Sequence, residues 1–262
     1  MGHKVKDIYE LCNTISPFNT QEVWDKSGLN LGSLNNSFES IVVCLEVTLP
    51  IAYDLKPNTL IITHHPLFFQ PLNTFCTDFY PANIANILLS KHCTLISLHT
   101  NFDKSHLNAY LTHKILQWEH FSAQGLLMNG NITPTPLDEL ARYVCDALGA
   151  KNVDFVKGDI PLYSMPLVSD IYVVCGSGCS LLSSLPFSPH TCLITGDVKH
   201  HDAMSAKSMG ISLIDMGHYE SEKYFGEIFE SILQNAGYNA IIADCENPFS
   251  LCLNQRDVKS LN

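Results

Sequence analysis

The sequence has few charged side chains and no cluster of positive ones. Only 16% of its 262 residues are charged, and 26 Asp and Glu outnumber 15 Lys and Arg, giving a formal charge of −11. A broad phosphate-binding surface needs clustered Lys and Arg, so a nucleic acid is not expected as a partner. The low charged content argues against long disordered arms. The 46% of hydrophobic residues supply the core of one large α/β domain or of two smaller lobes.

Paired cysteine motifs and long apolar runs are also absent. None of the ten cysteines forms a Cys-x-x-Cys pair, and several lie in apolar runs such as Val43-Cys44-Leu45, where a reduced thiol behaves as a small hydrophobe. No apolar run approaches the roughly 18 residues of a membrane helix. The first residues do not resemble a secretory signal. These features predict a cytoplasmic protein with reduced thiols and no membrane partner.

Short β-rich apolar runs alternate with helical patterns along the chain. Strands that are covered on both faces read as continuous apolar runs, so the alternation predicts an α/β fold with a mostly parallel sheet. The expected strands are Ile41–Val47, Thr59–Thr63, Thr94–Leu98, Ile171–Cys175, Thr191–Thr195 and Ile211–Asp215. The expected helices are Val5–Ser16, Pro81–Ser90, Leu107–Trp118, Pro136–Leu148, His201–Met209 and Glu220–Ala236. Ser122–Thr135 and Ser183–His190 are expected to be linkers, with a small inserted lobe between them.

An internal near-repeat is the most informative feature. Each half of the chain has a strand, a His-His pair, a helix, a second strand and a His-x-x-x-carboxylate. The residues concerned are His64, His65, His99 and Asp103 in the first half and His200, His201, His218 and Glu222 in the second. Polar residues beyond the carboxyl ends of parallel strands gather at one edge of a sheet. The repeat therefore predicts two weakly similar α/β halves that face each other and bring these side chains to one cleft.

The residue types in this set are those that bind divalent metal ions. Imidazole nitrogen and carboxylate oxygen suit zinc, iron, manganese and cobalt, and the absence of cysteine argues against a structural zinc site. A single histidine at a strand end is more often a hydrogen-bonded structural residue than a ligand. Four such elements in matching places make a coincidence a poor explanation, so the pattern favours a metal site.

At these residues the sequence resembles the GTP cyclohydrolase 1 type 2 homologue family, also called the NIF-three-like family. The matching stretches, in family order, are Val23–Gly32, Thr63–Phe68, His99–Asp103, Thr195–His201 and Gly217–Glu222. Two positions depart from the family pattern: Lys26 replaces the usual Asn, and Asp197 replaces the usual Glu. The chain has no room for the extra domain of the longer family members, so it resembles the short form.

The resemblance implies two interlinked α/β lobes and a dinuclear centre that holds two divalent metal ions per chain: zinc, iron, manganese or cobalt. The implied ligands are His64, His65, Asp103, His218 and Glu222, and His99, His200 and His201 are expected beside them as catalytic proton carriers. The approximate division is residues 1–122 for the first lobe, 123–188 for a middle segment continuing into the second lobe, and 189–262 for the second half-site and the return to the core. The short form implies a homo-oligomer, expected to be a hexamer.

The same resemblance implies a hydrolase of a small phosphorylated or nucleotide substrate that converts GTP to dihydroneopterin triphosphate and formate. The sequence has no P-loop and no Rossmann glycine fingerprint, so this activity depends on the resemblance. The alternative is a non-catalytic regulatory or metal-handling protein. An open coordination position beside a pocket would favour the enzyme, and a closed shell would favour the alternative.

Three smaller features leave alternatives open. Trp24 and Asp25 are either a packed aromatic with a turn-forming carboxylate or part of the rim of the site. Gly176-Ser177-Gly178 either cradles a phosphate through its backbone N–H groups or is a common turn. Lys199 either contacts an anionic substrate or is solvated.

Overall fold

Four strands from the first half of the chain and one from its C-terminal region, β13, form a five-stranded sheet in the order β13-β4-β5-β6-β2. In this computed structural model, which describes residues 3–159, 165–250 and 252, β13, β4, β5 and β6 are parallel and β2 is antiparallel to β6. The strands are β2 (Gly28–Leu31), β4 (Ser40–Cys44), β5 (Thr59–Thr63), β6 (Thr94–Ser97) and β13 (Ile241–Ile242), and β1 (His3–Lys4) pairs with β3 (Ser37–Phe38) nearby. Because β13 follows α9 in the chain, the chain returns to the first lobe after it has formed the second sheet.

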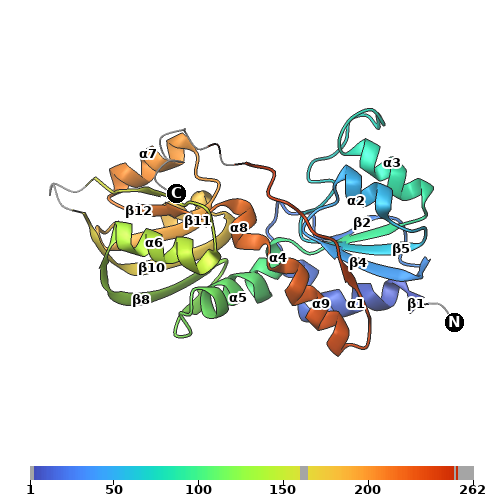
Figure 1. Cartoon of the computed structure of the whole chain (residues 1–262), viewed down its shortest axis with the longest axis horizontal. Coiled ribbons are helices and arrows are strands. Elements are labelled where there is room, and N and C mark those ends of the chain that lie inside the picture. The colour runs from blue at the N-terminus through green and yellow to red at the C-terminus, as the bar shows by residue number, and fades with distance from the viewer. Residues whose placement is uncertain (1–2, 160–164, 251, 253–262) are drawn as a thin grey trace, which may run out of the picture.

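The second half forms a six-stranded sheet in the order β7-β8-β10-β11-β12-β9. The three central strands, β10, β11 and β12, are parallel, and the outer pairs are antiparallel. The strands are β7 (Ser122–Gln124), β8 (Leu127–Pro136), β9 (Asp154–Val156), β10 (Leu167–Ser177), β11 (Thr191–Gly196) and β12 (Ser212–Asp215). Figure 1 shows this sheet beside the five-stranded one, with several helices between them.

Helices cover both faces of each sheet (Figure 1). They are α1 (Val5–Ile15), α2 (Leu49–Asp54), α3 (Ala82–Ser90), α4 (Thr100–Phe102), α5 (Asn108–Tyr110), α6 (Leu137–Leu148), α7 (His200–Met209), α8 (His218–Glu222) and α9 (Phe225–Asn235). Short 3₁₀ turns span Phe18–Thr20 and Cys179–Ser184, and π turns span Asp103–Leu107 and Leu111–Ile115. No helix in the described ranges is both long and apolar enough to cross a membrane.

Alternating side chains of each parallel strand enter different cores. In β4, Ile41 and Val43 pack with α1 and α9, whereas Val42 packs with α2 and α3. In β10, Ile171 packs with α6 and Val174 with α7. This alternation follows from the two-residue period of a strand. One of the cores includes residues from both sheets, so the two lobes share an interior.

The predicted α/β fold with a repeated strand–helix–strand unit is confirmed. β5, α3 and β6 form one unit, β11, α7 and β12 form the other, and in each unit the two strands are parallel neighbours. Two of the expected helices differ from the observed helices in where they begin and end. The helix expected at Leu107–Trp118 is part of a helical segment that alternates between α and π turns from Thr100 to Ile115. The helix expected at Glu220–Ala236 is two helices, α8 and α9.

The linker predicted at Ser122–Thr135 is wrong. The segment forms the hairpin of β7 and β8, with Gly125 in the turn at a φ of +64°. The expected inserted lobe is wrong as well, because β10 lies within the six-stranded sheet between β8 and β11. The glycines and polar residues that suggested a linker belong instead to an exposed turn and to outer strands, where polar side chains face solvent.

Candidate metal centre

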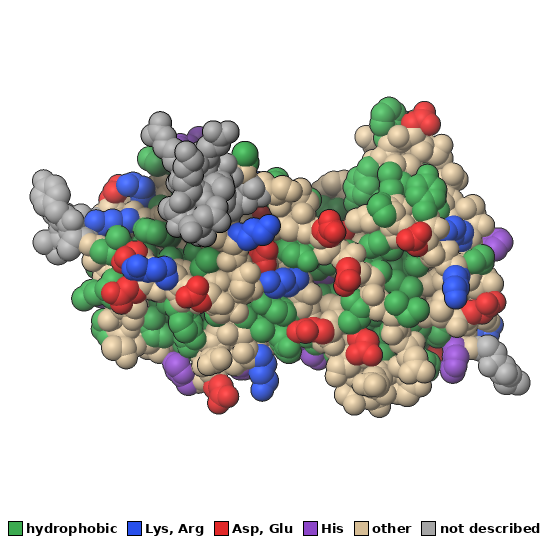
Figure 2. Space-filling view, viewed as in Figure 1, with side chains coloured by type: hydrophobic (Ala, Val, Ile, Leu, Met, Phe, Trp, Pro, Cys, Tyr) green, Lys and Arg blue, Asp and Glu red, His purple; other side chains and the backbone are tan. Residues whose placement is uncertain are grey.

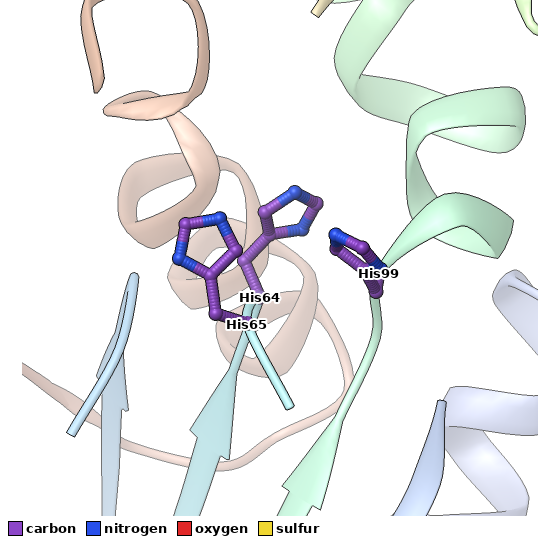
Figure 3. A group of neighbouring side chains, drawn as sticks. All are labelled: His64, His65 and His99. Atoms are coloured by element: carbon purple, nitrogen blue, oxygen red, sulfur yellow. The ribbon is translucent and has the colours of Figure 1, made fainter. Parts of the chain in front are cut away.

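Three histidines lie just beyond the ends of two neighbouring parallel strands (Figure 3). His64 and His65 follow β5 directly, and His99 follows β6. The backbone N–H groups of His64 and His65 both donate to the carbonyl of Leu45, at 3.1 and 2.9 Å. This turn ends the strand geometry that would send adjacent side chains to opposite faces. As a result, adjacent imidazoles approach each other with ring centroids 5.2 Å apart.

Helices supply the other members of the cluster. His218 and Glu222 lie one turn apart on α8, so they share a helix face. Asp103 begins a π turn, a rare local geometry that is frequent at functional sites. Gly176 at the end of β10 has a φ of +60°, and a Cβ there would lie 2.4 Å from Glu222 Oε1. A glycine is therefore needed to let the backbone approach the Glu222 carboxylate so closely.

The two oxygens of Glu222 face two different groups of side chains. Oε1 lies 3.5 Å from His64 Nε2, which is itself 3.5 Å from Asp103 Oδ1. Oε2 lies 2.9 Å from both His65 Nε2 and His218 Nε2, which are 3.3 Å from each other. Atoms bound about 2.1 Å from one tetrahedral ion lie roughly 3.4 Å apart. The spacing therefore suits two adjacent ions, with Glu222 between them.

Each imidazole of the two groups is held at its Nδ1 by an oxygen. The Nδ1 of His64 donates to the carbonyl of Leu98 at 2.9 Å. The Nδ1 of His65 donates to Glu46 at 2.6 Å, and that of His218 donates to Asp197 at 2.7 Å. Metal-ligating histidines are oriented in the same way, because the outer hydrogen bond fixes the tautomer and turns Nε2 toward the ion.

The clustered carboxylates and histidines favour the binding of a cation. Burial and the nearby Glu222 carboxylate raise the pKa of Asp103 well above its usual range. Burial opposes protonation of His65, but the charges of Glu222 and Glu46 outweigh it and raise the His65 pKa to about 10. The pKa of His218 rises to about 9, because its hydrogen bond and charge interaction with Glu222 outweigh burial. A divalent cation bound here would replace the protons that these groups otherwise hold.

Two buried polar atoms of the cluster lack any hydrogen-bond partner among the described residues. They are Nε2 of His64 and Oδ1 of Asp103, which face each other across 3.5 Å. Burial also lowers the pKa of His64 to about 4, so its Nε2 carries a free lone pair at neutral pH. Unpaired buried polar atoms are costly and rare in proteins, and a bound cation would satisfy both. The described residues therefore fit a metal centre, and each of the two groups around Glu222 can hold an ion.

His99 lies beside these groups and is held by a buried carboxylate. Its Nδ1 donates to Asp25 Oδ1 at 2.8 Å, and its ring lies 5.1 and 5.8 Å from those of His64 and His65. Thr100 N–H also donates to Asp25. The interaction with Asp25 favours the tautomer in which Nε2 of His99 accepts a proton. This geometry suits the predicted proton-transfer role and also allows His99 to bind an ion with His64 and His65.

The structure does not bring His200 and His201 to the cluster. Both lie at the exposed start of α7. In the first half of the chain the His pair follows its strand directly, whereas Asp197, Val198 and Lys199 separate β11 from His200. Asp197, immediately after the strand, makes the contact with the cluster through His218. The inserted residues thus move the second His pair away, and a catalytic role for it has no geometric support within this chain.

Two other features of the site differ from the sequence expectations. Glu46, which orients His65, was not predicted, although an acidic residue within the apolar run Ile41–Val47 was a usable signal. The phosphate-binding turn considered at residues 176–178 lacks two of the free backbone N–H groups that it would need. The N–H of Gly176 donates to Ser221 Oγ and that of Gly178 to Thr195 Oγ1, at 2.9 and 2.8 Å.

A cavity of about 770 Å³ opens onto the cluster. His65, His99, Asp103, His218 and Glu222 contribute to its wall. The rest of the wall is largely apolar or aromatic and includes Trp24, Leu49, Leu67, Phe69, Tyr80 and Leu181. A volume of this size accommodates a small organic ligand next to the candidate metal centre.

Comparisons with known proteins agree with the resemblance of the motifs. The chain is 45% identical over 247 residues to the Helicobacter pylori protein named GTP cyclohydrolase 1 type 2, covering 94% of this chain and 98% of that one. It is 34% identical to a Campylobacter jejuni protein named as a homologue of that enzyme, with 94% and 98% coverage. The crystal structure of a Staphylococcus aureus protein superposes with a TM-score of 0.82 at 22% identity, covering 95% of this chain and 99% of that chain, and shows the same fold.

A profile of one protein family also matches nearly all of the sequence. The Duf34/NIF3 (NGG1p interacting factor 3) profile matches residues 3–248, which include both strand–helix–strand units and every member of the cluster. The chain belongs to the Duf34/NIF3 family.

Proposed function

We propose that this protein is a dinuclear-metal-dependent hydrolase of a nucleotide-like substrate, with GTP as the first candidate. The observation that carries the proposal is the placement of Glu222, whose two oxygens face two separate groups of ligand atoms. The names of the Helicobacter pylori and Campylobacter jejuni relatives support GTP as the substrate to test first. The reaction would open the imidazole ring of guanine by hydrolysis and release formate.

The residues of this chain supply the rest of the chemistry. A pair of divalent ions can activate water and stabilise the developing charge on oxygen. Zinc, iron, manganese and cobalt all match the donor set of His64, His65, Asp103, His218 and Glu222. His99 is placed to accept or return a proton through Nε2, because Asp25 holds its Nδ1. The wall of the adjoining cavity is largely apolar, so an organic ligand bound there would displace water from beside the cluster.

A second candidate function is metal handling or regulation without catalysis. A further cavity reaches the cluster at His65 and His218, and its wall includes Asp154, Asp197 and Asp215. Among the described residues of this wall, carboxylates outnumber the single lysine, Lys151, so the cavity would attract cations. The largely apolar cavity lined by Trp24 and Phe69 favours the enzyme, because a storage site needs no apolar space for an organic ligand.

The proposed activity predicts that GTP is turned over by protein reconstituted with zinc, iron, manganese or cobalt. Formate release and pterin fluorescence would be followed for the native protein, for His64→Ala and for the exposed His190→Ala control. We expect native and His190→Ala protein to react alike and His64→Ala to lose at least about 100-fold in rate, as expected when a metal site is disrupted.

Equal rates for all three proteins would identify a contaminating activity. Metal-loaded native protein without turnover under any of the four ions would favour metal handling. Assembly into a hexamer and a cytoplasmic location remain predictions of the sequence.

A further inference from the structure

Trp24 is an exposed aromatic side chain on a firmly anchored loop. Its side chain is 53% exposed and lies in the wall of the cavity. The loop that carries it is fixed from below. Buried Asp25 accepts hydrogen bonds from Lys26 N–H, Ser27 Oγ and Thr100 N–H, and the N–H of Glu22 donates to Thr100 Oγ1 at 2.9 Å. The backbone is thus ordered while the indole stays open to solvent.

Trp24 forms an aromatic group with Phe69 and His99 in the cavity wall beside the cluster. The indole lies 5.8 Å from the Phe69 ring and 6.1 Å from the His99 ring. Phe69 is itself 41% exposed and lies 6.0 Å from His99, perpendicular to it. An exposed, ordered aromatic group beside a reactive centre offers a planar ligand a surface on which to stack.

The charges of the cavity determine what kind of planar ligand it suits. Glu22, Glu46, Asp103 and Glu222 contribute to the wall, and no Lys or Arg does so among the described residues. The nearby Lys104 ammonium is paired with Glu22 at 2.7 Å. On the face shown in Figure 2, Lys and Arg are scattered among carboxylates without forming a positive patch. The protein therefore offers phosphate groups no cationic partner in this cavity, apart from bound ions.

We propose that Trp24, with Phe69, forms the recognition surface for an uncharged heterocyclic ring, and that the protein side chains bind the base of a nucleotide while they leave its phosphates uncontacted. This inference rests on the proposed function in placing the ring next to the metal centre. In this proposal Trp24 determines specificity for the base, whereas the neighbouring His99 transfers protons. The nucleoside guanosine should then bind without any phosphate.

Tryptophan fluorescence can test this inference directly, because the chain has two tryptophans. Trp118 is buried against Phe121 and Tyr143, outside the cavity. In metal-loaded Trp118→Phe protein, emission therefore comes from Trp24. We expect guanosine to quench it saturably and tripolyphosphate to leave it unchanged. In metal-loaded Trp24→Phe protein, where Trp118 emits, guanosine should cause no saturable change.

Steady-state kinetics with GTP give a second readout. Loss of base–aromatic stacking in Trp24→Ala should raise KM by roughly 5- to 150-fold, with kcat nearly unchanged and Trp24→Phe intermediate. The matched control is Phe187→Ala, an exposed aromatic outside the cavity, which should change neither constant. Light scattering of Trp24→Ala shows whether the indole instead contacts another copy of the chain.

The outcomes separate this inference from the proposed function. Quenching by guanosine without any GTP turnover would support ring recognition and overturn GTP hydrolysis. Turnover without quenching, or a Trp24→Ala protein that loses kcat at unchanged KM, would overturn ring recognition alone. Quenching by tripolyphosphate, or a change of molecular mass in Trp24→Ala, would overturn it as well.

Discussion

Glu222→Gln protein is expected to retain neither of the two proposed metal ions. The Glu222 carboxylate is the buried group that faces both halves of the cluster, through Oε1 to His64 and through Oε2 to His65 and His218. Glutamine keeps the volume of the side chain but removes its charge, which leaves Asp103 as the only carboxylate of the predicted ligand set. We expect affinity to fall by more than the roughly 10- to 100-fold cost of losing an outer-shell partner.

Elemental analysis after gel filtration measures this effect. Native protein should carry close to two ions per chain, and Glu222→Gln close to none. The matched control is Glu119→Gln, which changes an exposed glutamate outside the cavity wall and should match native protein. A Glu222→Gln protein that still holds two ions would show that Glu222 does not join the two halves of the centre.

Glu46→Ala is expected to weaken metal binding without abolishing it. Glu46 accepts the Nδ1–H of His65 at 2.6 Å and so holds Nε2 of that ring toward the cluster. Its loss frees the ring to rotate and removes a nearby negative charge. Outer-shell losses of this kind cost roughly 10- to 100-fold in affinity. Competition against a chelator of known affinity measures the change.

Glu46→Gln provides the graded comparison, because its amide oxygen can still accept from Nδ1. The metal affinity of Glu46→Gln protein should lie between those of native and Glu46→Ala protein. Glu119→Gln again serves as the control that should match native protein. Native-like affinity in Glu46→Ala would mean that other contacts alone orient His65.

The parts of the site that could be predicted are those set by local chain geometry. His64 and His65 directly follow the apolar run Thr59–Thr63, and such a run indicates where a strand ends. The spacing of His218 and Glu222 places both on one helix face. The same reasoning failed for His200 and His201, because a pattern does not show how a few residues beyond β11 redirect the chain.

The parts that could not be predicted depend on contacts between distant segments. Asp25 reaches His99 across 74 positions, and Glu46 reaches His65 across 19. No local periodicity encodes such pairings. Tertiary packing also explains the hairpin of β7 and β8. Its polar residues are typical of a linker, but β8 becomes a strand because it pairs with β10. The position of Glu222 between the two groups of side chains likewise appears only when both lobes are in place.

The central claim is that two ions lie on either side of the Glu222 carboxylate, and anomalous diffraction from crystals of zinc- or manganese-loaded protein tests it most directly. The account predicts two anomalous peaks per chain. One should lie among His64, Asp103 and Glu222, and the other among His65, His218 and Glu222. A single peak shared by all five side chains, or peaks confined to His200 and His201, would contradict it.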